Sequence, residues 1–184
     1  EEELAGQIEA VAFEKEKIEV FLKSTKQTVL FINEEGEILL ANAAVQKMFG
    51  YRPEELLSKK PDMLLQPQDE KGVGILKICK QLRDNTGKVL ENYQGINKMY
   101  GFAFPVEVRL GAGTAKGQKV YSLLVTDISA RKKRETSMQK AMQNLQNLQR
   151  QLMEKQQQIK ELEKTTQEQQ QLIASQKAEL QAAK

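Results

Sequence analysis

The stretch that decides the fold is residues 28–50, which read TVLFINEEGEILLANAAVQKMFG. Two apolar runs flank an acidic turn around Gly36, and glycine there can adopt the positive φ that a tight turn needs. Asn42 then stands where a helix N-cap belongs, and Gly50 stands where that helix would end. The stretch therefore predicts a β-hairpin that leads directly into a short helix.

The segment after Gly50 predicts further helices. Pro53 opens a short helix with acidic residues in its first turn. A longer helix is predicted over residues 69–83, where Ile75 and Cys79 share one apolar face. Turn-forming residues close this second helix before the pattern changes to that of strands.

Three strands are predicted at about residues 89–97, 102–110 and 119–126. In the middle strand apolar side chains alternate with other types, which indicates one buried face and one wetter face. Pro105 cannot donate to a ladder, so an edge position or a bulge is expected there. The predicted fold class is α+β, with a five-stranded antiparallel sheet and helices packed on one face.

Both ends of the chain predict helices outside this domain. Leu4, Val11 and Ile18 are spaced by sevens, which predicts an amphipathic helix over residues 1–23. From Met138 a 3.5-residue apolar period predicts a parallel coiled coil over residues 131–184. The globular domain is then expected at residues 24–130. The predicted seam of the coil consists of Met138, Ala141, Leu145, Leu148, Leu152, Ile159, Leu162, Ile173 and Leu180.

Polar residues interrupt this seam, with Lys155, Gln169 and Gln176 at d positions and Thr166 at an a position. Polar core positions weaken a coiled coil but set its register. Two hypotheses follow: a marginal seam that lets small rotations propagate, or a rod that serves only as a spacer.

Composition excludes several classes of protein. The 184 residues carry 28 basic and 25 acidic side chains, a formal net charge of +3, which is no electrostatic footprint for nucleic acid. The single cysteine, Cys79, excludes an internal disulfide and favours a reducing, cytoplasmic location. No apolar stretch approaches the length of a membrane span, so no membrane contact by this segment is expected. Because the chain opens on Glu1, we expect it to be part of a longer protein.

The sequence contains no histidine. Histidine-based acid–base catalysis, a histidine phosphoacceptor and a histidine ligand to haem are therefore excluded. No nucleophile–base pair, cluster of metal ligands or phosphate-binding glycine loop is present either, so neither a metal site nor an enzyme is predicted.

Three stretches together resemble a PAS domain with its C-terminal PAC segment, over roughly residues 18–135. The first is FINEEGEILLANAA at residues 31–44, which continues into FGYRPEELL at residues 49–57. The second is GFAFPVEV at residues 101–108, and the third is Asp127-Ile128-Ser129 followed by Arg131. The chain departs from the family pattern at Tyr100, where Asp or Asn is frequent, and at Ser129, which replaces Thr but keeps the hydroxyl.

The resemblance implies a sensory and dimerisation module of a bacterial-type signalling protein, such as a sensor kinase, a chemotaxis transducer or a cyclase. It implies a parallel homodimer through the flanking helices, which relay a change in the domain to an output domain. It also implies that Asp127, Ser129 and Arg131 couple the sheet to the exit helix. The simpler alternative at this junction is a plain N-cap with a surface ion pair of about 0–1 kcal/mol.

A ligand pocket is expected, if one exists, between the sheet and the helices. A small molecule could sit there, or the same side chains could simply fill their own core. The LOV branch of the family needs a cysteine that is missing from residues 60–65, which excludes a covalent flavin adduct, and the cofactor otherwise stays unknown. An empty structural scaffold is the alternative function. The pocket candidates are Phe31, Met48, Met63, Leu64, Ile75, Cys79, Phe104, Val106 and Leu123.

Overall fold

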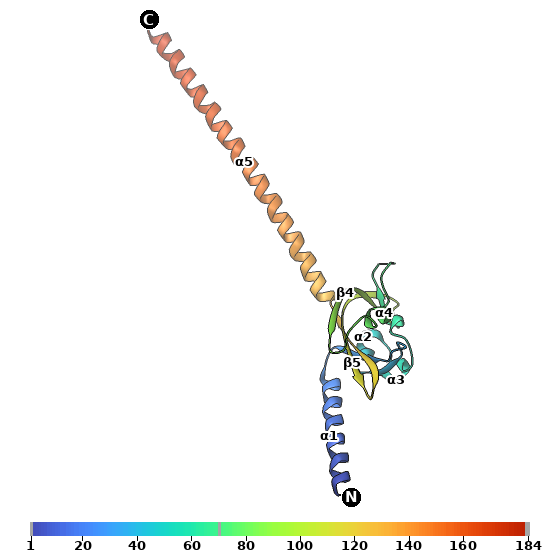
Figure 1. Ribbon diagram of the computed structural model, residues 1–184. Coiled ribbons are helices and arrows are strands. Elements are labelled where there is room, and N and C mark those ends of the chain that lie inside the picture. Colours follow the sequence, from blue (N-terminus) through green and yellow to red (C-terminus); the bar gives the residue numbers. More distant parts are fainter. Residues whose placement is uncertain (1, 70, 183–184) are drawn as a thin grey trace. The chain divides into compact units, whose positions relative to one another are not determined.

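The computed structural model describes residues 2–69 and 71–182, with side chains described over residues 6–69, 71–179 and 181–182. Two compact units divide the chain, Glu1–Arg131 and Lys132–Lys184. The first unit contains a helical lead-in and an α+β domain, and the second contains only helix (Figure 1).

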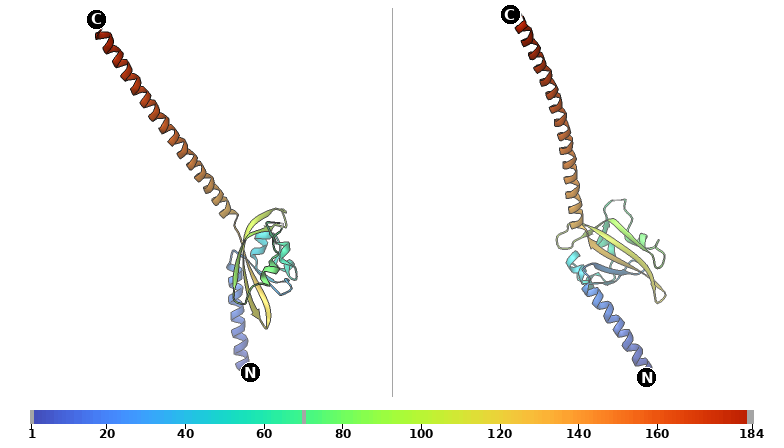
Figure 2. Two further views of the ribbon diagram at one scale, coloured as in Figure 1. Left: turned by 45° about the horizontal axis from the view of Figure 1, so that its top comes forward. Right: turned by 90° about the vertical axis from the view of Figure 1, so that its left-hand side faces the viewer.

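The α+β domain is built on a six-stranded antiparallel sheet with the strand order β2-β1-β6-β5-β4-β3. The short helices α2, α3 and α4 gather on one face of this sheet (Figure 2). The strands are β1 (Thr28–Ile32), β2 (Ile38–Ala41), β3 (Leu65–Pro67), β4 (Gly87–Ile96), β5 (Ala103–Ala115) and β6 (Gln118–Asp127).

The sheet has one strand more than the sequence predicted. The extra strand, β3, is only three residues long and pairs Leu65 with Gly95 of β4. Three residues that end in proline are too few to show the alternation of apolar and polar side chains that predicts a strand. The strand is recognised only by its pairing with β4.

The sequence predicted the hairpin and the helix after it correctly, but not the role of Asn42. Gly36 lies in the turn with φ of 83°, and α2 (Ala44–Phe49) follows β2. The N-cap of α2 is Ala43, which makes no side-chain cap hydrogen bond. The side chain of Asn42 is used for contacts between elements instead.

The helix predicted over residues 69–83 is much shorter than expected. Among the described residues only Ile75–Cys79 form α4, and Gly74 precedes it in extended conformation. Gly72 and Gly74 weaken a helix at the upstream end. The remaining short helices are α3 (Pro53–Leu56) and the 3₁₀ turn η1 (Pro61–Met63).

The core lies between the sheet and these short helices. Leu30, Leu123 and Leu110 pair across β1, β6 and β5, and each is at most 3% exposed. The neighbouring row Phe31, Ser122 and Gly111 therefore faces the other side of the sheet, because successive side chains alternate. This register contradicts the prediction that Phe31 lies between sheet and helices.

Pro105 lies where β5 has no ladder partner on one side, although β5 is an interior strand of the sheet. The ladder between β5 and β6 ends at the pair Val106 and Asp127, one residue short of Pro105. The backbone N–H of Ile128 then donates to the Pro105 carbonyl at 3.1 Å. The proline nitrogen thus faces the side where the partner strand has ended, and no ladder bond is lost.

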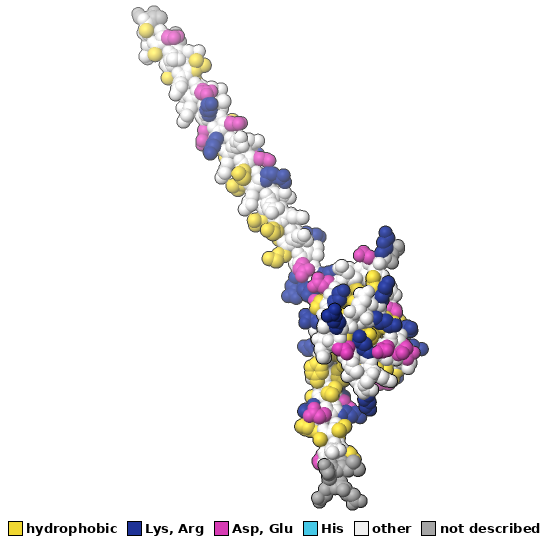
Figure 3. Space-filling view, viewed as in Figure 1, with side chains coloured by type: hydrophobic (Ala, Val, Ile, Leu, Met, Phe, Trp, Pro, Cys, Tyr) yellow, Lys and Arg dark blue, Asp and Glu magenta, His cyan; other side chains and the backbone are white. Residues whose placement is uncertain are grey.

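Helices flank the domain at both chain ends: α1 (Glu2–Ser24) and α5 (Ser129–Ala182). Hydrophobic side chains lie along both helices (Figure 3). In α1, Ile8, Val11 and Ile18 are 58–69% exposed, so the domain of the same chain leaves them uncovered. No helix in the described part of the chain has the length and apolar character needed to cross a bilayer.

Candidate functional site

The two flanking helices connect to the same end of the sheet. Thr28 begins β1 and pairs with Val125, two residues before β6 ends. Because β1 and β6 are antiparallel neighbours, the end of α1 and the start of α5 both adjoin this end of the two strands. A change in the pairing of β1 with β6 would therefore act on both connections.

The start of α5 is held by a local hydrogen bond between a side chain and the backbone. The N–H of Ser129 donates to Asp127 Oδ1 at 2.8 Å, an arrangement that serves an orphan donor of the first helical turn. Ile128, between them, is 4% exposed and anchors the junction in the domain. Asp127 thus accepts a hydrogen bond at the junction between β6 and α5, where the sequence predicted the change from strand to helix.

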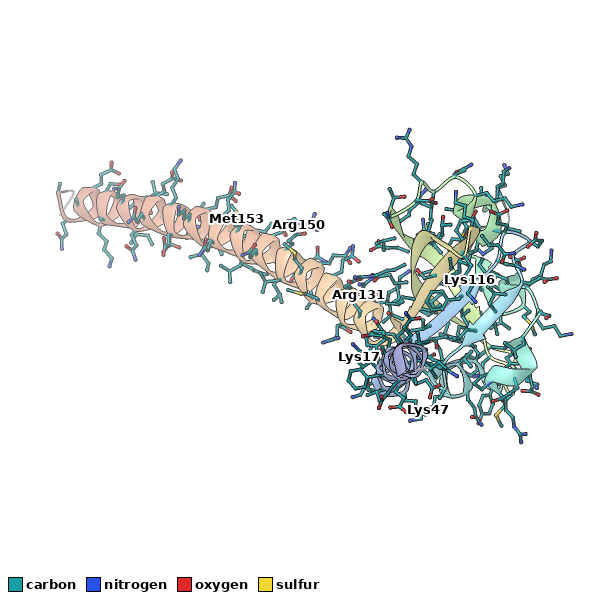
Figure 4. The ribbon with its side chains drawn as sticks, turned by 60° about the horizontal axis from the view of Figure 1, so that its bottom comes forward. Lys17, Lys47, Lys116, Arg131, Arg150 and Met153 are labelled. Atoms are coloured by element: carbon teal, nitrogen blue, oxygen red, sulfur yellow. The ribbon has the colours of Figure 1, made fainter. Side chains whose placement is uncertain are left out.

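Arg131, in the first turns of α5, contacts a buried acid on the sheet. Its Nη1 donates to Glu107 Oε2 at 3.1 Å, and its Nη2 lies 3.9 Å from Glu91 Oε1 (Figure 4 labels Arg131). Glu107 also accepts from Arg109 Nε at 2.9 Å through its other oxygen. One carboxylate on β5 therefore joins the sheet to the exit helix through a charge-assisted bond.

Glu107 is the functional candidate that the sequence reasoning missed. Only 7% of it is exposed, although it lies on the face of the sheet opposite the short helices, paired with Thr126. The hydrogen bonds from Arg109 and then Arg131 lower the pKa of this carboxyl and keep it ionised. The available signal was an acid between two valines in a predicted strand, Val106 and Val108, because a buried acid needs a cationic partner.

Asn42 holds the other connection, between α1 and the sheet. It is 5% exposed, and its Oδ1 accepts from the N–H of Val29 at 2.9 Å. Its Nδ2 donates to the carbonyl of Leu22 in α1 at 3.1 Å and to that of Gln27 at 3.0 Å. One buried amide thus joins the last turn of α1 to β1.

A further bond links the two connections to each other. Gln27 Nε2 donates to Thr126 Oγ1 at 3.0 Å, and Thr126 is the cross-strand neighbour of Glu107. Polar contacts therefore lead from the last turn of α1 through Asn42 and Gln27 to Thr126, and the cross-strand neighbour of Thr126, Glu107, bonds Arg131. Proximity of this kind permits coupling between the two connections but does not by itself demonstrate it.

The predicted pocket residues are distributed over three environments. Met48 is partly buried against the core, Met63 is 36% exposed at the end of η1, and Phe31 lies on the opposite face of the sheet. The other six pack in one cluster at 0–7% exposure, which is the arrangement of a filled core. These six are Leu64, Ile75, Cys79, Phe104, Val106 and Leu123.

Cys79 belongs to this core. Its side chain is fully buried, and burial raises the pKa of the thiol to about 11. A thiol in that state is a small apolar side chain with little thiolate at neutral pH. Among the described residues no group of three or more His, Cys, Asp and Glu side chains could hold a metal ion.

The predicted seam of the coil lies on one uninterrupted helix. Leu145, Leu148, Leu152, Ile159 and Leu162 of α5 are 54–65% exposed. Met138 and Ile173 continue this stripe in both directions at 77% and 52%, and Ala141 is exposed as well. The side chain of Leu180 lies outside the described residues.

These features define a class of protein: a small α+β domain with a packed core and a helix at each end, both attached at one end of its sheet. The family model of the PAS fold matches residues 16–128. The chain therefore belongs to the PAS family. No curated protein sequence matches the chain.

Solved structures show the same fold. The PAS domain of an HTR-like protein from Haloarcula marismortui is 14% identical with a TM-score of 0.58, covering 67% of this chain and 99% of its own. A PAS domain from a two-component sensor histidine kinase is 16% identical with a TM-score of 0.51, covering 64% and 98%. The PAS domain of a protein from Colwellia psychrerythraea is 15% identical with a TM-score of 0.52, also covering 64% and 98%.

Proposed function

We propose that the chain is a sensory and dimerisation module whose domain passes a structural change to α5, and that a second copy of α5 forms a parallel coiled coil with it. A signalling module of this kind fits the PAS family, and one of the structural neighbours is a PAS domain from a two-component sensor histidine kinase. The observation that carries the proposal is the bond between Glu107 on the central strand β5 and Arg131 on the exit helix.

The apolar stripe of α5 supports the dimer. Side chains such as Leu152 and Ile159 are 60% and 54% exposed on a helix of 54 residues. Leucine and isoleucine at heptad spacing are stabilised when a second helix covers them, and an isolated helix gains nothing from this pattern. We therefore assign the stripe to pairing between copies of the chain. We propose no enzymatic activity for this part of the protein.

Sedimentation of the full chain tests the dimer. Leu152→Asp combined with Ile159→Asp places charges in the seam and should convert a dimer to a monomer. Met153→Asp combined with Gln157→Asp adds the same charge at heptad positions b and f, outside the seam, and should leave the dimer intact. A seam variant that sediments as a dimer would show that α5 is not the dimerisation element.

The packed core favours a second candidate function, a structural scaffold with no ligand. Six of the predicted pocket residues, Phe104 and Leu123 among them, fill the core at 0–7% exposure. Native mass spectrometry and an absorption spectrum of the purified chain separate the two functions. A bound small molecule supports sensing by ligand, and a colourless dimer of the bare chain mass supports the scaffold.

A further inference from the structure

A cavity of the first unit lies where α1 meets the domain. It has a volume of about 560 Å³, within the size range of small-ligand sites. One wall comes from the last turn of α1 and the following linker, and the other comes from α2. The residues that line it include Lys23, Lys26, Ala43, Ala44, Lys47 and Met48.

The two walls of this cavity are fixed to each other. The Asn42 side chain donates to the carbonyl of Leu22 on the α1 side and to that of Gln27 at the end of the linker. Asn42 itself lies two residues before the start of α2 and is 5% exposed. A buried amide that bonds both walls gives the cavity a defined shape.

The charge of the cavity is unbalanced. Three lysines line it, and no acidic residue does. Lys23 has one ion pair, with Glu19 at 3.6 Å, whereas the described residues give Lys26 and Lys47 none (Figure 4 labels Lys47). Ammonium groups that share one small cavity repel each other, and an anion among them would relieve that repulsion.

Part of the cavity lining is apolar. Met48, Ala43 and Ala44 line it together with the lysines. The Thr28 hydroxyl donates to the Met48 sulfur at 3.5 Å, which holds that side chain on the β1 side. A ligand here would place a compact carbon or phosphorus centre against the apolar residues and its negative charges against the lysines.

We propose that this cavity binds a small polyvalent anion that carries two or more carboxylate or phosphate groups. The site lies outside the packed core and requires neither a dimer nor a pocket between sheet and helices. A ligand bound by Lys26 and Lys47 bridges the linker after α1 to α2, and so stabilises the arrangement that Asn42 holds.

Titration of the ¹⁵N-labelled full chain with pyrophosphate, and separately with citrate, tests the proposal by NMR. Saturable shifts should be concentrated at residues 23–26 and 43–48 for at least one of the two probes. The probe that binds more tightly identifies the charged group, phosphate or carboxylate. Shifts scattered over the lysines of the whole domain would overturn the proposal.

Two matched double variants complete the test. Lys26→Ala with Lys47→Ala should weaken binding by about tenfold, because two charge pairs with exposed lysines are lost. Lys60→Ala with Lys88→Ala removes the same charge from residues that do not line the cavity, and should weaken binding by less than about twofold. Equal losses in the two variants would show non-specific attraction and overturn the site.

Discussion

Replacement of Glu107 by glutamine tests the junction most directly. The change keeps the size of the side chain, removes the charge that two arginines share, and replaces one of the two acceptor oxygens with a donor NH2 group. Glu107 is 8% exposed in its side chain, whereas Arg109 and Arg131 are 61% and 45% exposed. The acid is thus buried, and both of its partners remain partly in water.

The magnitude follows from this geometry. A hydrogen bond to a charged group contributes about 1.5–3 kcal/mol when both ends are buried, and exposed ion pairs contribute about 0.2–1 kcal/mol. With half-exposed partners, Glu107→Gln should cost the sheet about 1–2 kcal/mol. The coupling free energy between Glu107 and Arg131, from a double-mutant cycle, should be about 0.5–1.5 kcal/mol.

Hydrogen exchange of the full chain, followed by mass spectrometry, measures both quantities. Peptides from β5 and β6 report the stability of the sheet, and peptides covering residues 129–134 report the first turns of α5. Arg109→Gln is the matched control, because it removes the other partner of Glu107 without touching the helix. It should weaken the sheet and leave the first turns of α5 protected.

The direction of the pH dependence is also determined. The two arginines lower the pKa of Glu107 in the folded state. The ionised carboxylate therefore makes its full contribution to the free energy of unfolding at any pH above the pKa that Glu107 has in the unfolded chain. This contribution is lost as the pH falls through the lower pKa of the folded state. The wild type should therefore be more stable than Glu107→Gln by a constant amount above about pH 5, and the difference should shrink below about pH 4. Unchanged exchange in residues 129–134 at neutral pH would refute the coupling.

Three further outcomes are expected. Asn42→Ala removes three hydrogen bonds of a buried amide, so it should destabilise the domain by about 2–4 kcal/mol and increase hydrogen exchange in residues 20–27. The control variant Asn147→Ala, on α5, should have neither effect. Cys79 should react with a thiol reagent only after unfolding, because it is buried and its pKa is raised to about 11; modification of the native chain at neutral pH would contradict the core assignment. Gly95→Ala should unfold the domain or lower its free energy of unfolding by about 2–3 kcal/mol, because the added methyl group would lie 2.6 Å from the Phe104 ring. A urea titration measures this change, and an unchanged midpoint would show that the ring can move aside.

Several elements of the fold were predictable because their signals are local. The hairpin around Gly36, the alternation of residues 102–110 and the heptads after Met138 each depend on residues close together in the chain. The PAS resemblance followed from the same stretches, and the match over residues 16–128 confirms it. The long helix α5 was likewise predicted with its start near residue 131, close to the observed Ser129.

The tertiary structure decided which residues of those elements meet. The run of β1 is apolar at four successive positions, from Val29 to Ile32, so its composition cannot say which face Phe31 occupies. Pairing with β6 decides this, because a shift of one residue exchanges the two faces of a strand. The same pairing brings the start of β1 beside the end of β6.

The sequence by itself therefore determined the family, the two flanking helices and the heptad stripe. The structure alone assigned Arg131 to Glu107, twenty-four residues away, and Asn42 to the last turn of α1. The physical reason is that a periodic pattern depends only on residues close together in the chain, whereas strand register determines which residue lies next to a buried polar group. A buried acid or amide in a sequence shows that a partner is required, and only the fold shows which residue it is.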